Sequence, residues 1–411
     1  MGKKRLVMIL GAGSSIPCGM PSVGDIDALM RGWAAEYARS RGVPDYFALA
    51  WEALAEHSRF GFASARQPVT FERVLSDLVG LMHWLRPAPE GGALRSLVGA
   101  PALRPTLAFA HPQGFGPSLE VKAMVAHLLA RLGREMRSRC LALAPDFSEL
   151  LRWRQVLDGL RDRLEVVIYN LNYDTVALSC WPGAFTGFDG DGRFDPASVH
   201  RRDWEGLFHL HGTVHFSLAD PVGERICWRD DLGGEFVDSD DRSADQGSNG
   251  NDFLRSTLVA GGFKLDQLLV EPFHTYRAAL VRDAALADAI VIGGYGFTDA
   301  HVNRALRGPL LHARDRPPVL VLDWAGEKTD PLDFREDRWS HALHEALYAG
   351  GRWLGAGGGI PERPWDLVAQ GRCELSVPHR VALWYGGFTG AAPIIGRLAG
   401  WLDCGDDALL G

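Results

Sequence analysis

Residues Leu6–Ile16 read LVMILGAGSSI, and this stretch decides how the chain can fold. An apolar run that ends directly in the small residues Gly11-Ala12-Gly13-Ser14-Ser15 is typical of the first strand and first loop of a doubly wound α/β fold. Glycines there let backbone amides approach a pyrophosphate, and a following helix adds the positive end of its dipole. The third glycine of the dinucleotide fingerprint is missing, because Ile16 stands there. The stretch predicts a nucleotide loop, with a plain tight turn as the alternative, and disfavours an ordinary dehydrogenase.

Composition and charge narrow the class of protein. The chain has 411 residues, of which 46% are hydrophobic, enough for two or three structural units with a large core. The net charge is −8, whereas a nucleic-acid-binding protein is typically basic. No apolar run approaches the roughly 18 residues of a membrane span, and the N-terminal MGKKRL has no signal-peptide core. We expect a cytoplasmic protein that contacts neither nucleic acid nor membrane.

Six cysteines are scattered along the chain without a C-x-x-C pair. This spacing indicates neither a zinc ribbon nor a disulfide framework. Reduced, buried thiols are the simplest interpretation.

A long helical region follows the glycine loop. Phe71–Leu85 has helical periodicity, whereas Pro87–Pro117 is rich in Gly and Pro and predicts irregular structure. Residues 25–160 therefore predict a helical insertion after the first strand and loop of residues 1–24. Seven apolar residues at i, i+3, i+4 and i+7 spacing predict one buried helix face: Val121, Met124, Val125, Leu128, Leu129, Leu132 and Met136. Four arginines on or near the other side predict a solvated face: Arg131, Arg134, Arg137 and Arg139.

Strand-like runs resume after residue 160 and alternate with helical stretches such as Tyr276–Ala287 and Asp299–Leu306. This alternation predicts a parallel sheet that the first strand joins, so residues 161–325 complete a Rossmann-like, doubly wound α/β domain. The expected strands are Val166–Tyr169, Leu207–Leu210, Leu268–Val270, Ala289–Ile292 and Val319–Leu322. The acidic, Ser/Gly-rich Val237–Asn251 predicts a mobile surface loop. Residues 326–411 form a Trp/Gly-rich C-terminal segment whose pattern favours no particular fold.

Three further loops follow predicted strands and carry polar groups suited to a ribose or a base. They are Tyr169–Thr175 (YNLNYDT), Leu207–Thr213 (LFHLHGT) and Gly293–Asp299 (GGYGFTD). Because the loops at the carboxyl ends of parallel strands converge on one crevice, these loops are expected to meet the first glycine loop. Each also has a structural explanation: a hydrogen-bonded turn, a satisfied histidine, and a helix N-cap by Asp299.

Taken together and in order, the four loops resemble the sirtuin family of NAD-consuming enzymes. Gly11–Ser15 resembles the opening Gly-Ala-Gly loop of the family, and Asn172-Tyr173-Asp174 resembles its Asn-x-Asp motif. His211-Gly212 resembles its catalytic His-Gly, and Gly294–Asp299 resembles its second nucleotide-binding glycine loop. The resemblance covers about half of the chain.

Several departures from the family pattern indicate which branch of the family the chain resembles. Deacylating sirtuins carry the paired cysteines of a zinc ribbon after the His-Gly motif, whereas that interval here holds only Cys227. The lobe that helps form the acyl-lysine groove is therefore expected to be absent. Asn170-Leu171 stands in place of the usual Thr-Gln, and Gly296 in place of a usual Ser. With its large helical insertion, which contains Thr70–Leu75 (TFERVL), the chain resembles the divergent sirtuin-like domains of bacterial antiviral defence systems, which hydrolyse NAD and deplete it in infected cells.

The resemblance implies roles for individual residues. His211, with an ordinary pKa of about 6.5, can accept a proton from a ribose hydroxyl or a water at neutral pH. Asn172 would orient the ribose or the attacking water, and Asp174 would bind the substrate or stabilise developing positive charge. His209, which alternates with His211, and His215 are expected to be structural. NAD is the expected substrate, no metal is required, and the expected binding residues are Gly11, Ala12, Gly13, Ser14, Ser15, Gly294, Tyr295, Gly296 and Asp299.

The leading hypothesis is an NAD⁺ glycohydrolase that yields nicotinamide and ADP-ribose, with a cyclised product as a variant, and serves as an abortive-infection effector. An NAD-dependent protein deacylase or ADP-ribosyltransferase is the enzymatic alternative. A non-catalytic subunit that binds NAD or ADP-ribose is the alternative of another class. An unregulated NAD hydrolase would harm its host, so we expect gating by homo-oligomerisation, a partner ATPase such as a HerA-like one, or a phage-derived trigger.

Overall fold

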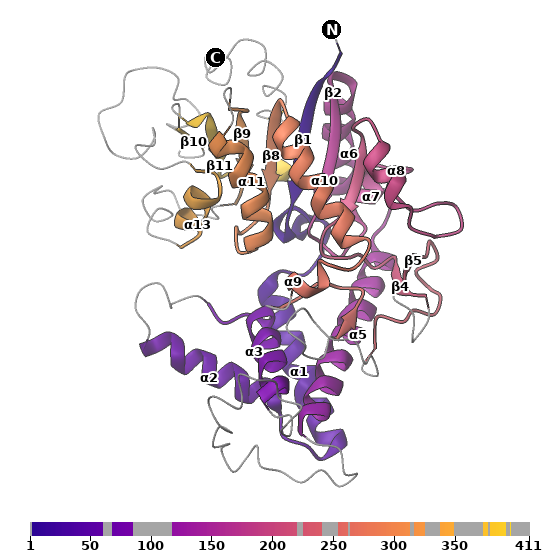
Figure 1. Ribbon diagram of the computed structural model, residues 1–411, viewed down its shortest axis with the longest axis vertical. Helices are drawn as coiled ribbons and strands as arrows, with labels where there is room; N and C mark the ends of the chain where they lie inside the picture. The colour runs from indigo at the N-terminus through magenta and orange to yellow at the C-terminus, as the bar shows by residue number, and fades with distance from the viewer. Residues whose placement is uncertain are drawn as a thin grey trace.

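The computed structural model describes residues 2–60, 68–84, 117–219, 225–240, 254–261, 264–312, 316–324, 338–348, 373–376, 379–391 and 395. At its centre lies a seven-stranded sheet in the order β10-β11-β9-β8-β1-β2-β3 (Figure 1). Six strands are parallel, and β10 is an antiparallel edge strand. The strands are β1 Lys4–Leu10, β2 Leu164–Asn170, β3 Gly206–His209, β8 Ala289–Gly293, β9 Val319–Leu322, β10 Cys373–Ser376 and β11 Val381–Trp384.

The apolar first strand occupies the middle of this sheet. Residues 6–10 are at most 1% exposed, and β1 pairs in parallel with β2 on one side and with β8 on the other. The chain winds from β1 through β2 to β3, then returns to β8 and continues outward through β9. The carboxyl ends of β1 and β8 therefore form the topological switch point at which such sheets bind ligands. The predicted doubly wound, mostly parallel α/β sheet is confirmed.

Helices cover both faces of the sheet, because both faces of a parallel sheet are apolar. Leu6, Met8 and Leu10 share an apolar cluster with residues of α6 (Ser148–Arg163). Val7 and Ile9 alternate to the opposite face and share a second cluster with α10 and α11. The predicted helices 276–287 and 299–306 are confirmed as α10 (Phe273–Leu286) and α11 (Ala300–His312).

Four helices form a separate helical unit next to the carboxyl ends of the strands (Figure 1). The unit begins with a capping box, in which Ser22 and Asp25 satisfy each other's backbone amides. All seven apolar residues predicted to form a buried face in 121–136 are at most 3% exposed. The helices are α1 Val23–Arg41, α2 Tyr46–Phe60, α3 Phe71–Trp84 and α5 Pro117–Ala142. Since α6 contacts β2, we propose that the insertion within residues 25–160 ends with α5. The predicted irregular stretch 87–117 lies outside the described residues, except that Pro117 begins α5.

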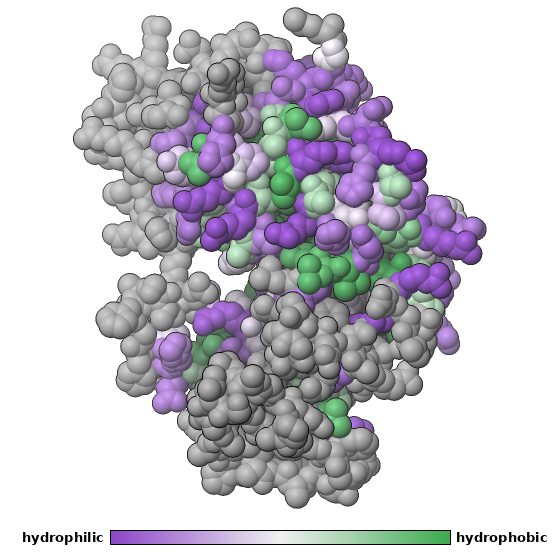
Figure 2. Space-filling view, in the orientation of Figure 1, coloured by the Kyte–Doolittle hydropathy of each residue, from purple (hydrophilic) through white to green (hydrophobic). Residues whose placement is uncertain are grey.

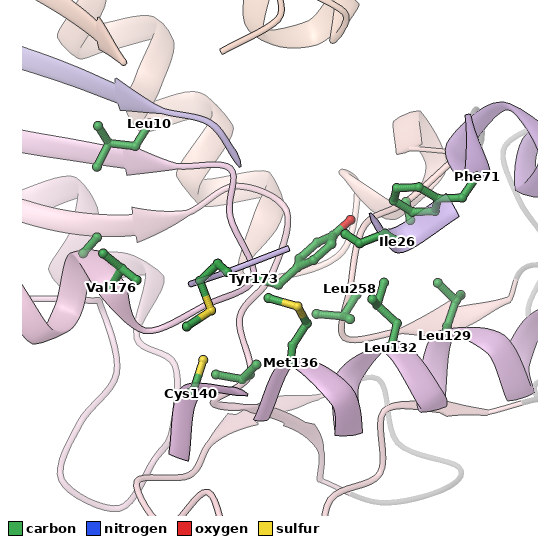
Figure 3. Close-up of a cluster of buried hydrophobic side chains, with 14 of the residues drawn as sticks. Leu10, Ile26, Phe71, Leu129, Leu132, Met136, Cys140, Tyr173, Val176 and Leu258 are labelled. Atoms are coloured by element: carbon green, nitrogen blue, oxygen red, sulfur yellow. The ribbon is translucent and has the colours of Figure 1, made fainter. Parts of the chain in front are cut away.

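The helical unit packs against the loops that carry the predicted site. Figure 3 shows Met136 and Cys140 of α5 beside Tyr173 and Val176, which follow β2. Leu258, from the segment after β3, belongs to the same apolar cluster. The predicted site residues therefore lie between the sheet and the helical unit.

The C-terminal segment extends the sheet. β11 pairs in parallel with β9, and β10 pairs antiparallel with β11. Phe388, just after β11, stacks on Trp153 of α6 with ring centroids 3.8 Å apart. A helix, α13 (Arg338–Ala346), contacts α11. Where this segment is described, it packs on its own domain.

The prediction of a strand at Leu268–Val270 is wrong. These residues form a turn after the short helix α9 (Lys264–Gln267), and Leu269 is 61% exposed. Figure 2 shows apolar residues at the surface where α9 leads into α10. Three consecutive apolar residues are too few to establish a period, so the run could not distinguish a strand from a turn.

The predicted solvated face of α5 is wrong for Arg137. Its guanidinium makes two hydrogen bonds of 2.6 Å to the carboxylate of Asp238, and both side chains are buried. Asp238 precedes β6 (Ser239–Asp240), so the start of the predicted mobile loop 237–251 is anchored in a buried ion pair. Residues 241–251 of that loop lie outside the described residues.

The remaining expectations concern thiols and membrane spans. Cys18, Cys140 and Cys180 are buried free thiols, and Cys227 is a half-buried one. In the part of the chain that the structure describes, no helix combines the length and apolarity needed to cross a bilayer.

Candidate functional site

The two glycine loops are bonded directly to each other. The Gly11 amide donates to the carbonyl of Gly293 at 2.9 Å, and the Gly13 amide donates to the carbonyl of Gly294 at 3.0 Å. Gly294 has a φ of +62°, and a Cβ there would lie 2.2 Å from the Ser14 nitrogen. Only glycine fits such a backbone approach, so the ends of β1 and β8 form one joined structure.

Most backbone amides of the first loop already donate hydrogen bonds to backbone carbonyls. The Ser14 and Ser15 amides donate to the carbonyls of Gly11 and Ala12 in a 3-10 turn, at 2.9 and 3.0 Å. Of the five amides from Gly11 to Ser15, the Ala12 amide is thus the one that lacks an acceptor among the described residues. A pyrophosphate at this loop would be met chiefly by the Ala12 amide, rather than by a full row of amides.

Asn172 ties the loop after β2 to the first glycine loop. Its side-chain nitrogen lies 3.0 Å from the Gly11 carbonyl and 3.1 and 2.9 Å from the Ser14 and Ser15 hydroxyl oxygens. Because the Gly11 carbonyl can only accept, the amide orientation is fixed. The backbone amide of Asn172 donates to the side chain of Asn170 at 3.1 Å. The Asn172 side-chain oxygen is therefore the atom that remains for a substrate.

Asp174 lies in the same group but is buried. One carboxylate oxygen accepts the Val176 amide at 2.9 Å, at the start of α7 (Val176–Cys180). Burial raises the pKa of Asp174 to about 6, although hydrogen bonds from the Val176 amide and the Ser15 hydroxyl favour the ionised form. These contacts hold the turn, and the catalytic role of Asp174 stays a prediction.

His211 belongs to a second group of side chains. It stands two residues beyond the end of β3, before Gly212, whose φ is +88° and whose Cβ would lie 2.0 Å from the Thr257 carbonyl oxygen. The His211 Nε2 atom lies 3.2 Å from Nε2 of His301 and 3.8 Å from a carboxylate oxygen of Asp299. Burial holds the pKa of His211 well below 6.5, so its imidazole is neutral and able to accept a proton at neutral pH.

Asp299 links His211 to two residues that the sequence did not single out. Its carboxylate accepts the Lys264 ammonium at 2.5 Å, and the same ammonium lies 3.0 Å from both carboxylate oxygens of Glu72. Asp299 starts α11 through its backbone carbonyl, which accepts the Asn303 amide, rather than through its side chain. The Asp299 amide donates to the Tyr295 hydroxyl at 3.1 Å. The Asp299 side chain therefore does not cap α11 and instead pairs with the Lys264 ammonium.

The charges of this group stabilise one another. Burial would raise the pKa of Asp299, but the Lys264 ammonium, which donates to this carboxylate, lowers it below its usual range. Burial would lower the pKa of Lys264, but the two carboxylates raise it. Burial raises the pKa of Glu72, which the ammonium partly offsets. Lys264 therefore serves as a fixed positive charge between two acidic side chains.

The two other histidines of the β3 region have structural surroundings. His209 is fully buried, its ring faces Phe216 and Trp228, and burial lowers its pKa to about 3. Its Nδ1 atom lies 3.4 Å from the side-chain nitrogen of Asn170. His215 stacks on Trp228 with ring centroids 4.5 Å apart. Neither lies in the group around His211.

His211, Asp299 and His301 also offer three donor atoms within 4.8 Å of one another, a set that suits a transition metal. The Lys264 ammonium already gives the Asp299 carboxylate a cationic partner, which disfavours a second cation beside it. The expectation that no metal is required stays a prediction. A cavity of about 460 Å³ lies between α1 and α2, and no predicted site residue lines it.

No protein-family model and no curated protein matches the chain. Similarities to solved structures are weak. A structure addressing the basis of sirtuin substrate affinity shares 13% identity over 85% of this chain and 95% of its own, at a TM-score of 0.33. A complex of a Sir2 homologue with NAD shares 13% identity over 84% and 91%, at a TM-score of 0.34. Sir2 bound to an acetylated peptide shares 12% identity over 83% and 92%, at a TM-score of 0.31. The fold assignment rests on the strand order and register of the sheet.

Proposed function

We propose that the protein is an NAD⁺ glycohydrolase, which converts NAD⁺ and water into nicotinamide, ADP-ribose and a proton. The observation that carries this proposal is the convergence of the four loops at the carboxyl ends of β1, β2, β3 and β8. Asn172 is bonded to the first glycine loop, that loop is bonded to Gly294, and Asp299 of the same second loop lies beside His211. These contacts connect residues that lie far apart in the chain, from Gly11 to Asp299, which supports a single site.

The groups at the joint suit an NAD⁺ substrate. The Ala12 amide is available for a phosphate oxygen, whereas the Ser14 hydroxyl donates to the Gly11 carbonyl and the Ser15 hydroxyl bonds to Asp174. Gly296 of the second glycine loop is exposed, so a nucleotide can approach its backbone closely. The Asn172 side-chain oxygen remains for a ribose hydroxyl or a water. These contacts would orient the substrate without any change in the sheet.

The reaction needs a proton acceptor more than an acid. Breaking the N-glycosidic bond leaves its electron pair on the nicotinamide nitrogen and neutralises the cationic ring, so no proton has to be donated to this leaving group. The ribose carbon, left with oxocarbenium character, forms a bond to water, and the water loses a proton. His211 is the acceptor that we assign, because its imidazole is neutral at pH 7. The Asp299 carboxylate, 3.8 Å away, would stabilise the imidazolium that results.

The reaction class is tested by incubating the purified protein with NAD⁺, with and without an acetylated peptide, and quantifying products by chromatography. The proposal predicts equal release of nicotinamide and ADP-ribose whether or not the peptide is present. Release that requires the peptide, with transfer of its acetyl group, would instead support the deacylase alternative. NAD⁺ binding by calorimetry without turnover would support the non-catalytic alternative.

We also propose that the hydrolase is gated and acts as an antiviral effector that depletes cellular NAD. The His211 side chain is only 4% exposed, and the helical unit packs against the loops of the site. Such a buried catalytic group favours an enzyme that opens on oligomerisation or on binding a partner or trigger. Light scattering combined with activity tests this regulation. A monomer at every concentration with full activity would contradict it.

A further inference from the structure

We propose that Lys264 and Glu72 are positioning residues for the site: Lys264 holds the Asp299 carboxylate beside His211, and Glu72 of the helical unit holds Lys264. This inference rests on the proposed role of His211 as proton acceptor. It makes the helical unit a direct contributor to the site through one side chain.

Lys264 forms a buried ion-pair bridge between two carboxylates, which we call the tether, rather than a surface ion pair. Its side chain is 11% exposed, and its ammonium contacts both carboxylate oxygens of Glu72 at 3.0 Å and one oxygen of Asp299 at 2.5 Å. Three elements meet at this one nitrogen atom: α3, α9 and the loop before α11. Charge-assisted hydrogen bonds from one ammonium to two carboxylates hold both carboxylates in fixed positions.

The tether determines where Asp299 can lie. The oxygen that receives the Lys264 ammonium is the same atom that lies 3.8 Å from Nε2 of His211. Without the ammonium, this carboxylate would be free to move toward the two imidazoles and to pair with one of them as an imidazolium. A protonated His211 cannot accept a proton, so Lys264 keeps Asp299 near His211 while preventing that pairing.

The charged and titratable groups around His211 come from several elements. Glu72 faces Lys264 from the helical unit, and Asp27 of α1 acts in turn on Glu72. Asp299 and His301 face His211, and Arg277 of α10 acts on His301. Among these groups Lys264 and His301 disfavour protonation of His211, whereas Asp299 favours it. Removing Lys264 therefore raises the pKa of His211, and removing Asp299 lowers it further.

The test measures His211 itself, by NMR titration of histidine-labelled protein, with its signal assigned by loss in His211→Gln. In the folded, unmodified protein, the imidazole of His211 should stay neutral at every pH near neutrality. In Lys264→Met its titration should move to higher pH, and Lys264→Arg, which keeps the charge, should restore the original behaviour. An unchanged titration in folded Lys264→Met would overturn the proposal.

A second variant covers the case in which Lys264→Met does not fold, because it leaves two acidic side chains without their cation. The double variant Glu72→Gln/Lys264→Met removes one carboxylate with the ammonium, and the same rise in the pKa of His211 is expected. Arg137→Met is the matched control, since it removes a different buried cation, one that lies on α5 of the helical unit. It should lower stability without moving the His211 titration, whereas a shift of the same size would overturn the proposal.

If the protein hydrolyses NAD⁺, the kcat and KM of the variants provide a further test. Glu72→Gln should lower kcat by about 10²-fold with a much smaller change in KM, because a displaced catalytic group lowers the rate more than the binding. In Lys264→Met the acidic limb of the rate profile should move to higher pH. A change confined to KM would contradict the positioning role. Absence of hydrolysis in the unmodified protein would refute the proposed function alone, since the NMR titration still decides this inference.

Discussion

The side-chain amide of Asn172 donates to the carbonyl oxygen of Gly11 at 3.0 Å and so joins two loops 161 positions apart in the chain. The same nitrogen reaches the hydroxyls of Ser14 and Ser15. A residue expected to touch the substrate thus also builds the loop that would hold it. Substitutions at this position should therefore affect stability as well as activity.

Asn172→Asp tests this dual role. A carboxylate oxygen cannot donate to the Gly11 carbonyl and would face it as a second acceptor, although the Ser14 amide and hydroxyl still donate to that carbonyl. Because the new carboxylate is buried without the donor contacts that the amide made, the free energy of unfolding should fall by about 1–3 kcal/mol. Urea denaturation without NAD⁺ measures this change. Unaltered stability would mean that the hydrogen bond has no structural role and that Asn172 acts on substrate alone.

Gly13→Ala should destabilise the protein even without a ligand. A Cβ at this position would lie 2.8 Å from the Cα of Gly294, so the two glycine loops would have to separate. Overpacking of this kind costs about 1–3 kcal/mol, and the melting temperature should fall accordingly. Gly190→Ala is the matched control, because nothing lies within 4 Å of its Cβ position. Equal melting temperatures for the two variants would refute the loop joint.

Asp174 should make stability fall as the pH rises. Its pKa is about 6 in the folded protein, above the ordinary 3.8, so the folded state binds the proton more tightly than the unfolded state does. This contribution is fully present below pH 3.8 and is lost as the pH rises through 6, by roughly 3 kcal/mol in total. Asp174→Asn should remove that part of the dependence, as urea denaturation between pH 4 and 7 can measure. Parallel stability curves for the two proteins would contradict the raised pKa.

Arg137→Met should destabilise the protein strongly. It leaves the carboxylate of Asp238 buried without a partner, and breaking such a pair costs about 3–5 kcal/mol. Arg134→Met, on the exposed side of the same helix, should change stability by less than about 0.5 kcal/mol. Thermal unfolding of both variants decides the matter. Similar small effects would restore the solvated-face interpretation for Arg137.

The sheet could be predicted because its signal is local. The apolar run before Gly11 and the runs that begin at Val166, Leu207, Ala289 and Val319 are each long enough, and each leads into a polar or glycine-containing loop. The rule that parallel strands end at one crevice then brings the loops together. Leu268–Val270 had no such context, since it follows the short helix α9.

The charged partners could not be predicted because their signals are not local. Arg137 and Asp238 are 101 positions apart, and Glu72 and Lys264 are 192 apart. Periodicity places Arg137 on a helix face but does not reveal a carboxylate that the fold brings to it. His301 offered a weak signal, since it stands two residues after Asp299, and Lys264 offered another as an isolated lysine in a chain rich in arginine.

The most direct measurement is nicotinamide release from NAD⁺ by the unmodified protein and by two matched variants, His211→Gln and His215→Gln. His215 stacks on Trp228 outside the site and serves as the control. The predicted result is release by the unmodified protein and by His215→Gln, with a loss of about 10²-fold or more in folded His211→Gln. Equal release by all three proteins would contradict the assignment of His211 as the proton acceptor.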